Sequence, residues 1–291
     1  MKRCTKCTSA YAGVDWTCPA CGFAPNQMEG FTLLAPELAL QGSGFQPETH
    51  AELATLEAGN FWFRARNQLI VWAMRRHFPD VQHYLEIGCG TGFVLAGVAQ
   101  AYPQAQITGS EIFSTGLPFA LARLPNAELL QMDARHIPYE EEFDVVGAFD
   151  VLEHIDEDER VLAEMKRALR PNGGIILTVP QHPQLWSRQD DYACHVRRYK
   201  MGELREKVKR AGFHVVFETS FVSLLLPAMA ASRLMPHKQE VVVDELAELR
   251  LPTLLNSAFE AVMKIERLLI RMGMRFPIGG SGLLIAKKRK Y

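Results

Sequence analysis

The chain has 291 residues, of which 48% are hydrophobic, and a formal net charge of −1. This length and apolar content are enough to bury a full core, and they fit one large domain with additions. The near-neutral charge argues against a dedicated nucleic-acid binder, because such proteins are usually basic overall.

The cysteines and the N-terminus indicate a reducing compartment. Four of the six cysteines lie in the first 21 residues and two are isolated, which is not the pattern of a secreted disulfide framework. No apolar stretch follows Met1 to Cys4, so no signal peptide is predicted. The apolar run from Phe221 to Ala231 falls well short of the ~20 residues of a spanning helix. We therefore expect a cytoplasmic location.

Residues 1–24 contain two C-x-x-C knuckles separated by ten residues. Four thiolates in this arrangement are a ligand set for tetrahedral zinc. A segment this short cannot bury a core, so zinc is expected to hold it folded as a closed, structural site. Redox-active or free thiols are the alternative, and they suit paired knuckles poorly. The predicted zinc ligands are Cys4, Cys7, Cys18 and Cys21.

Residues 25–47 carry Pro25, Pro36, Gly42, Gly44 and Pro47, and they predict a linker. A helical stretch is expected from 50 to 77, with a break at Gly59-Asn60. Strands and helices then alternate, which implies a parallel sheet covered on both faces and right-handed crossovers. Strands are expected at 84–87, 106–112, 128–132, 143–149, 175–179 and 213–217. Helices are expected at 91–101, 114–123, 156–169 and 202–211, with Asp156 as an N-cap and a turn at 171–174.

The most informative segment is the glycine turn that follows the first of these strands. Gly88, Gly90 and Gly92 stand at alternate positions, which lets the backbone turn sharply and approach a ligand closely. The helix that begins beyond them offers free N–H groups. This arrangement is typical of nucleotide-like cofactor sites in doubly wound sheets. A dinucleotide dehydrogenase would show G-x-G-x-x-G instead, and the preceding Glu86 also disfavours that class.

Five segments in order resemble the class I S-adenosylmethionine-dependent methyltransferases. They are the glycine turn, Glu111, the sequence 132–134, the sequence 149–155 and the turn 169–174 with the strand after it. The resemblance covers about residues 50–220 and a last strand at 282–286. It implies an α/β fold: a doubly wound, mostly parallel seven-stranded sheet whose last strand is antiparallel.

The resemblance implies S-adenosyl-L-methionine as the cofactor. The glycine turn would wrap its methionine part, Glu111 would bind the ribose hydroxyls and Asp133 would lie near the adenine amine. An aromatic and arginine segment upstream would cover the cofactor, with a guanidinium on its carboxylate and a ring against the sulfonium. The alternative for that segment is a core-packing helix with an exposed arginine pair. The residues expected at the cofactor are Phe61, Trp62, Arg64, Arg66, Glu86, Gly88, Cys89, Gly90, Gly92, Glu111, Ile112, Asp133, Ala134 and Asp150.

Methyl transfer from a sulfonium is an in-line displacement that depends on alignment, and a general base helps when the acceptor is a hydroxyl or a carbon acid. The candidates for catalysis are Glu153, His154 and His195. Asp150, Glu153 and His154 also resemble the ubiquinone-biosynthesis O-methyltransferases, in which residues at this spacing can hold a divalent metal. Asp150 is a shorter carboxylate than that family has, and packing of His154 beside the cofactor is the alternative.

The loop at 190–199 is the second candidate acceptor region. Its His195, Arg197, Arg198 and Tyr199 could bind an anionic or phenolic acceptor, and a solvated basic loop is the alternative. Strand C-terminal ends are where ligands bind in such sheets, which favours this position.

Residues 221–280 form a long helical insert before the last strand, with breaks at Pro227, Pro236 and Pro252. A helix over 253–272 is predicted to be amphipathic. Basic residues beside it suit an anionic membrane surface, and they equally suit an acceptor cap or a homodimer interface. The predicted apolar stripe is Leu255, Ala258, Phe259, Val262, Ile265, Leu269 and Met272.

The sequence therefore predicts a methyltransferase with an N-terminal zinc ribbon, acting on a small-molecule or lipid-like acceptor. It would lie in the cytoplasm, or on the inner membrane face if the insert binds lipid. An RNA methyltransferase is a second hypothesis, because ribosomal guanine methyltransferases also join a zinc module to this fold, but the low charge makes a nucleic-acid partner unlikely. A third is a non-catalytic cofactor-binding scaffold whose ribbon binds a protein. The expected domains are a ribbon at 1–24, a linker at 25–47, a cofactor-binding domain at 48–220 with 281–291, and the insert at 221–280.

Overall fold

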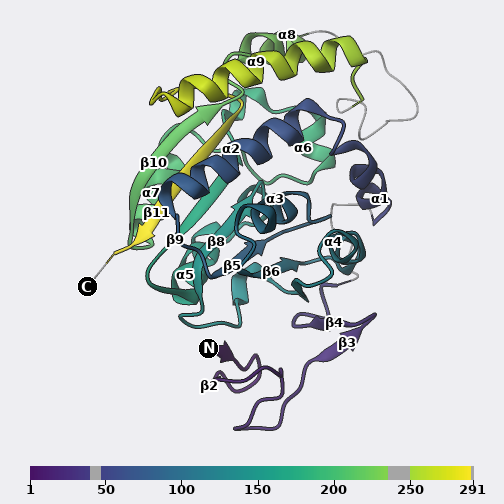
Figure 1. The fold of residues 1–291 in the computed structure, drawn as a ribbon, viewed down its shortest axis with the longest axis vertical. Coiled ribbons are helices and arrows are strands. Elements are labelled where there is room, and N and C mark those ends of the chain that lie inside the picture. The colour runs from purple at the N-terminus through teal and green to yellow at the C-terminus, as the bar shows by residue number, and fades with distance from the viewer. Residues whose placement is uncertain (40–46, 235–249, 290–291) are drawn as a thin grey trace.

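The computed structural model describes residues 1–39, 47–234 and 250–289 (Figure 1). Within these residues nine strands form one sheet, in the order β10-β11-β9-β8-β5-β6-β7-β4-β3. A separate two-stranded ribbon lies at one end of the molecule's long axis, and helix α9 lies at the other (Figure 1).

Seven of the nine strands form the predicted doubly wound sheet. Strand β5 carries the glycine turn at its end, and it pairs in parallel with β6 and β8. Strand β11 runs antiparallel to both of its neighbours, β9 and β10. The predicted fold class, with an antiparallel last strand, is confirmed. The strands are β5 (His83–Ile87), β6 (Gln106–Glu111), β7 (Glu128–Gln131), β8 (Phe143–Phe149), β9 (Leu169–Pro180), β10 (Phe213–Phe221) and β11 (Ser281–Lys288).

Helices bury both faces of this sheet because successive strand residues point to opposite sides. Val145 packs into the core shared with α2, α3 and α9, whereas Val146 packs into the core shared with α5 and α7. The break predicted near residue 60 is present, and the Asn60 side chain caps α2 by accepting from the Trp62 amide at 2.8 Å. The helices are α1 (Pro47–Leu56), α2 (Phe61–His77), α3 (Phe93–Ala101), α4 (Leu117–Arg123), α5 (Asp158–Ala168), α6 (Arg188–Tyr192), α7 (Glu203–Arg210), α8 (Leu226–Leu234) and α9 (Thr253–Arg271).

The expected linker at 25–47 is partly wrong, since it contains two strands of the main sheet. Strands β3 (Asn26–Met28) and β4 (Phe31–Leu33) form a hairpin, and β4 pairs in parallel with β7. All three residues of β4 are buried. The pairing of β4 with β7 covers a sheet edge that would otherwise be open. The prolines and glycines of this segment do not reveal that pairing. The seven predicted strands therefore become nine, and residues 40–46 of the expected linker lie outside the described part of the chain.

The N-terminal ribbon rests on the main domain rather than standing apart. Its strands are β1 (Lys2–Arg3) and β2 (Ala10–Tyr11). The Arg3 amide donates to the Pro138 carbonyl at 2.8 Å, and the Glu140 amide donates to the Met1 carbonyl at 2.9 Å. The Trp16 and Tyr139 rings meet edge to face with centroids 5.5 Å apart. This small module thus gains both main-chain and aromatic contacts with the main domain.

Two local predictions differ from the structure. Helix α5 begins at Asp158 with Glu157 at its N-cap, so Asp156 is not the cap. Asp158 is instead buried in ion pairs with Arg197 and Lys207. The turn expected at 171–174 lies inside β9, because β9 already pairs with β8 at Leu169. The register between these two strands shifts over this segment.

The predicted stripe of α9 is only partly buried. The buried residues of this helix are Met263, Glu266 and Ile270, and the stripe residues Phe259 and Val262 pack against the same core. Ile265 and Met272, which belong to the same predicted stripe, are 55% and 74% exposed. Because apolar residues occur on two sides of this helix, periodicity alone selected a stripe with members on both. Pro227 lies in the first turn of α8 and Pro252 precedes α9, while Pro236 lies outside the described residues.

Among the described helices, none is both long enough and apolar enough to cross a bilayer.

Candidate functional site

The glycine turn occupies the C-terminal end of β5, where ligands bind in doubly wound sheets. Its three glycines have positive φ angles of 66°, 51° and 77° at Gly88, Gly90 and Gly92. A Cβ on Gly88 would lie 2.4 Å from Val151, and one on Gly92 would lie 2.9 Å from Ala120. A Cβ on Gly90 would meet no atom within 4 Å. Two glycines are therefore required by the protein's own packing, whereas Gly90 faces open space that a ligand can fill.

Glu111 ties this turn to the next strand. One of its carboxylate oxygens accepts from the Gly90 amide at 2.9 Å, and the other accepts from the Ile112 amide at 2.8 Å. Burial raises the pKa of Glu111, although these amides oppose that rise. Cys89 is buried between the glycines, and its amide donates to the Ser110 carbonyl at 2.9 Å. Glycine turn and acidic residue thus form one rigid unit.

Two further carboxylates lie along the same edge. Glu86 is 2% exposed and accepts from the Tyr84 hydroxyl at 3.1 Å, and burial raises the pKa of Glu86 to about 8. Asp133 follows β7 and accepts from the Arg135 amide and guanidinium. Burial opposes its ionisation, but Arg135 outweighs it and lowers the pKa of Asp133. Ala134 begins the short helix that Asp133 caps.

The aromatic and arginine segment of α2 divides between two directions. Arg66 pairs with Asp150 at 2.7 Å and lies over the Trp62 ring at 4.6 Å. This brings α2 against the end of β8, beside the glycine turn. Phe61 and Arg64 contact α9 instead: the Phe61 ring lies 5.3 Å from that of Phe259, and Arg64 pairs with Glu260 at 2.6 Å.

A second cluster of polar side chains follows β8 and β9. Glu153 is fully buried, and neither of its carboxylate oxygens has a hydrogen-bond partner. The nearest basic side chain is that of His195, whose Nε2 lies 4.0 Å from Glu153 Oε1. The ring of His154 lies 4.7 Å from that of His195. Burial, and secondarily the charge of Asp150, raises the pKa of Glu153 well above its usual range. Burial and the neighbouring His195 lower the pKa of His154 to about 4.

Asp190 orients His195, a contact that sequence reasoning missed. Its Oδ1 lies 2.8 Å from His195 Nδ1 and 2.7 Å from Arg198 Nε, and the Ser187 amide donates to its other oxygen. Burial opposes ionisation of Asp190, but His195 and Arg198 hold its pKa well below the usual range. The Ser187-to-Asp190 capping box at the start of α6 was the available sequence signal.

The loop expected to bind an anionic acceptor uses its other polar residues internally. Arg198 is committed to Asp190, while Arg197 pairs with Asp158 at 2.8 Å. The Tyr199 hydroxyl donates to the same Asp158 carboxylate at 2.6 Å. These three side chains brace the loop, so neither acceptor binding nor a solvated basic loop describes them. His195 alone among the four remains directed at Glu153.

Two groups of residues are spaced to hold a metal ion within the described chain. In one, ligand atoms of Glu153, His154 and His195 all lie within 4.8 Å of one another. Asp150, expected in this set, is paired with Arg66 and is replaced by His195. The other group is the cysteine module, in which Cys4–Cys21 and Cys7–Cys18 sulfurs are 3.7 and 3.6 Å apart. Thiolates about 2.3 Å from a tetrahedral zinc would stand at nearly this separation.

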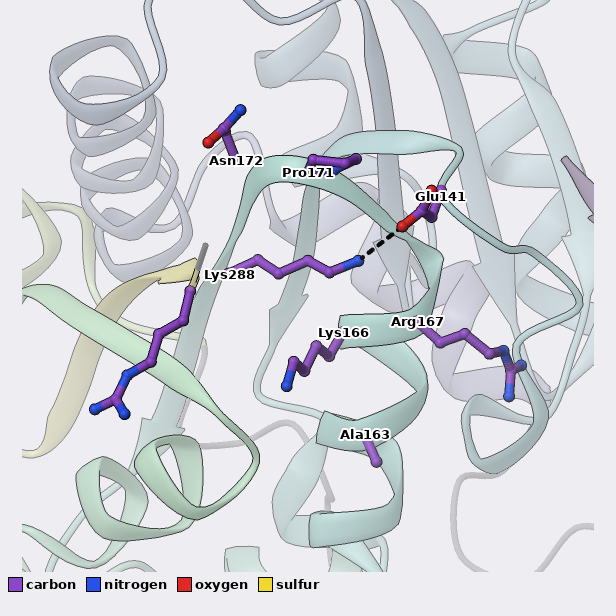
Figure 2. A pocket seen from close by; sticks show the side chains of 8 residues that line it. Glu141, Ala163, Lys166, Arg167, Pro171, Asn172 and Lys288 are labelled. Carbon is purple, nitrogen blue, oxygen red and sulfur yellow. Dashed lines mark ion pairs between the residues drawn. The ribbon is translucent and has the colours of Figure 1, made fainter. Parts of the chain in front are cut away.

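A prominent surface hollow lies elsewhere. It has a volume of about 570 Å³, and half of its eight lining residues are basic, including Lys166, Arg167 and Lys288 (Figure 2). Lys288 pairs with Glu141 across it at 3.5 Å (Figure 2). This hollow lies at the N-terminal ends of β8 and β9, the opposite edge from the glycine turn, so it does not belong to the candidate site.

The segment that carries the glycine turn is also similar in sequence to known proteins. The segment 85–177 matches the family described as methyltransferase domain. This chain contains a methyltransferase domain. A protein of Mycolicibacterium smegmatis named "Probable S-adenosylmethionine-dependent methyltransferase" is 27% identical over 162 residues, which cover 54% of this chain and 60% of that protein. The chain therefore spans less than two thirds of that relative.

A second sequence relative and a solved structure are also similar to this chain. A ubiquinone biosynthesis O-methyltransferase of Pseudomonas aeruginosa is 28% identical over 157 residues, covering 47% of this chain and 66% of that enzyme. A solved Haloferax volcanii methyltransferase complex, which includes the Trm112 methyltransferase activator, superposes with a TM-score of 0.56 at 16% identity. That match covers 84% of this chain and 98% of the other, and it supports the fold alone.

Proposed function

We propose that this chain transfers a methyl group from S-adenosylmethionine to a small-molecule or lipid-like acceptor. The observation that carries the proposal is the rigid pairing of Glu111 with the Gly90 amide, beside open space at Gly90. The relatives named for S-adenosylmethionine-dependent methyl transfer and for ubiquinone biosynthesis support it. The proposal names the acceptor only as a small molecule or a lipid-like molecule.

The cofactor would lie along the C-terminal edge of β5, β6 and β7. The glycine turn would hold its methionine part, Glu111 its ribose hydroxyls and Asp133 its adenine amine. Arg66 and Trp62 would cover it from α2, near Asp150. Arg64 and Phe61 would act indirectly, because their contacts fix α2 against α9.

The chemistry requires alignment of the acceptor with the transferred methyl group and removal of a proton. S-adenosylmethionine supplies the methyl group on its sulfonium when bound. We assign the proton acceptor to Nε2 of His195, because the Asp190 carboxylate beside Nδ1 keeps the proton on that nitrogen and leaves Nε2 free. Asp190 is thus a positioning residue. Glu153 and His154 would line the place where the acceptor hydroxyl meets His195.

A divalent ion is the second candidate arrangement for the same residues. The unpaired carboxylate of Glu153, together with His154 and His195, fits an ion that accepts imidazole and oxygen ligands. Asp190 would then be the outer carboxylate that orients a ligating histidine. Such an ion would supply Lewis-acid activation of the acceptor oxygen. Manganese binding by His195→Ala and Asp150→Asn variants decides the ligand set: loss only in His195→Ala supports a set that contains His195, and loss only in Asp150→Asn refutes it.

The N-terminal module is proposed to be a zinc ribbon with a structural ion. Its four sulfurs stand close enough together for one ion, and its first residues also bind the main domain through main-chain hydrogen bonds. Metal analysis of the purified chain should find about one zinc per molecule. Cys18→Ser should abolish it, whereas Cys194→Ser, at an exposed cysteine outside the module, should not. A folded, zinc-free wild-type chain would refute the ribbon.

The cofactor assignment is tested by binding of S-adenosylhomocysteine. Calorimetry should give a one-to-one complex, and the ligand should raise Tm by mass action. Glu111→Ala should weaken binding by about 10- to 100-fold, while the exposed control Glu206→Ala should bind as wild type does. Absence of binding to the wild-type chain at saturating ligand would overturn the function.

The acceptor class is tested by transfer of a labelled methyl group into separated cell fractions. Lipid extract, aqueous small molecules and RNA are supplied separately with S-adenosylmethionine labelled at its methyl carbon. Label in the lipid or small-molecule fraction supports the proposal. Label only in RNA would identify an RNA methyltransferase, and cofactor binding without transfer to any fraction would identify a scaffold.

A further inference from the structure

Helix α9 carries a second apolar face, opposite to the one that packs on the core. Its members are exposed residues separated by four and three positions in turn, which keeps them on one side of a helix. Leu254 is 87% exposed, Ile265 55%, Leu268 57% and Met272 74%. Single exposed apolar residues are ordinary, but an unbroken row along five turns is not. The outward row is Leu254, Ala258, Ala261, Ile265, Leu268 and Met272.

Apolar exposure continues past the end of this helix. Met274 and Ile278 are 46% and 51% exposed, and Leu224, before α8, is 42% exposed. Among the described residues, seven of the fourteen exposed large apolar side chains lie between 254 and 278. Figure 1 shows α9 running along the outside of the molecule at one extremity. Exposed apolar side chains are thus concentrated in this part of the chain.

The carboxylates and the cations of α9 differ in exposure. Both of its carboxylates serve contacts within the fold: Glu260 pairs with Arg64, and Glu266 is buried and accepts from the amides of Val222, Ser223 and Leu224. Lys264 is 61% exposed, although it also approaches Glu260 at 3.5 Å, and Arg271 is exposed. The exposed charged side chains of α9 are therefore both cations, Lys264 and Arg271.

We propose that the outward face of α9 binds an anionic lipid surface. An apolar row bordered by lysine and arginine is the pattern of helices that lie in a membrane interface, where acidic headgroups attract the cations. A second copy of the chain fits less well, because each copy would bring the same exposed cations, Lys264 and Arg271, to the shared interface.

This face is mechanically joined to the cofactor site. The Asn256 side chain accepts from the Phe61 amide at 2.8 Å, Arg64 pairs with Glu260, and Arg267 donates to the Gln68 side chain at 2.6 Å. These contacts fix α9 along α2, the helix that carries Trp62 and Arg66. Membrane binding would therefore hold the site at the surface where a lipid-like acceptor resides, a role that rests on the proposed function.

Vesicle flotation of the full chain tests the proposal. The wild-type chain should float with phosphatidylcholine vesicles that contain phosphatidylglycerol, and much less with phosphatidylcholine alone. The double substitution Ile265→Glu with Leu268→Glu should reduce the bound fraction by about tenfold or more. Lys264→Glu with Arg271→Glu should remove the preference for phosphatidylglycerol and its sensitivity to salt. Val14→Glu, at a 91% exposed apolar residue of the ribbon, should float as wild type does.

S-adenosylhomocysteine binding and light scattering are measured on the same samples. Retained cofactor binding in the α9 variants shows that they are folded, and it separates failure of this inference from failure of the proposed function. A wild-type chain that does not float, or an Ile265→Glu, Leu268→Glu variant that floats equally well, overturns the inference. A wild-type dimer that this variant converts to a monomer, without any flotation, would assign the face to a second copy.

Discussion

The cofactor side and the acceptor side of this site are held in different ways. Glu111 and Asp133 are fixed by main-chain amides within their own turns or by the adjoining glycine turn. Asp190 and His195 depend on Arg198 and on each other, and neither carboxylate oxygen of Glu153 has a hydrogen-bond partner. One side is built by local backbone geometry, and the other by side chains that tertiary folding brings together. Substitutions should therefore cost binding on the first side and stability on the second.

The largest effect is expected at the glycine turn. Gly92 and Gly202 both have a φ of 77°, but a Cβ clashes with Ala120 only at Gly92. Gly92→Ala should lower S-adenosylhomocysteine affinity about 100-fold and destabilise the fold by about 2–4 kcal/mol, from backbone strain plus overlap. Gly202→Ala carries the strain alone and should cost about 1 kcal/mol without changing affinity. Affinity is measured by calorimetry and stability by thermal unfolding. Equal affinity and equal stability of the two variants would show that the overlap between the new Cβ and Ala120 relaxes.

A paired substitution separates the two sides directly. Asp190→Asn leaves the buried Arg198 without its counter-charge, and it should destabilise the fold by about 2–4 kcal/mol with cofactor affinity unchanged. Glu111→Gln should do the reverse, with weaker S-adenosylhomocysteine binding and little loss of stability. Both are measured by denaturant unfolding and calorimetry. An Asp190→Asn variant as stable as wild type would remove the distinction.

The buried Glu86 gives the cofactor side a pH dependence. Its folded pKa of about 8 lies above its unfolded pKa, so the unfolded chain releases a proton that the folded chain retains. Its contribution should therefore fall as pH rises from about 4.5 to 8, by about 2 kcal/mol or more, and level off above 8. Glu86→Gln should remove this slope from the ligand-free chain. Denaturant titrations of both forms between these pH values measure it, and identical slopes would contradict the burial argument.

The smallest effect is expected where the cofactor side meets the insert. Arg64 pairs with Glu260 near the surface, so Arg64→Ala should cost about 0.5–1 kcal/mol. If Arg64 only fixes α2, S-adenosylhomocysteine affinity should fall no more than a few-fold, and Glu260→Gln should have the same effect. A much larger loss of affinity in Arg64→Ala alone would place its guanidinium on the cofactor.

The sequence predicts the cofactor side well because its signals are local. The glycine turn, Glu111 and Asp133 each lie at the end of a strand that the alternation of strands and helices predicts. The resemblance to the methyltransferases then gives each of them a role, in the order of the chain. Strand β4 was missed because Phe31, Thr32 and Leu33 are too few to alternate, and their partner strand is about a hundred residues away in sequence. The pairing of Asp190 with His195 was missed for a similar reason, since it depends on a buried arginine and on the fold of the loop. Helix α9 was predicted in place, but the predicted stripe mixes buried and exposed residues, because both sides of the helix are apolar.

The pairing of β4 with β7 affects how the protein avoids aggregation during folding and purification. Without residues 1–35, β7 would become the outermost strand of the sheet, with free amides and carbonyls along a flat apolar edge. The fully buried Gln131 would also lose both of its hydrogen bonds to Ala35. Open edges of this kind recruit strands from other molecules. A chain shortened to its methyltransferase domain should therefore aggregate, which makes the N-terminal segment a safeguard of solubility for the fold that it precedes.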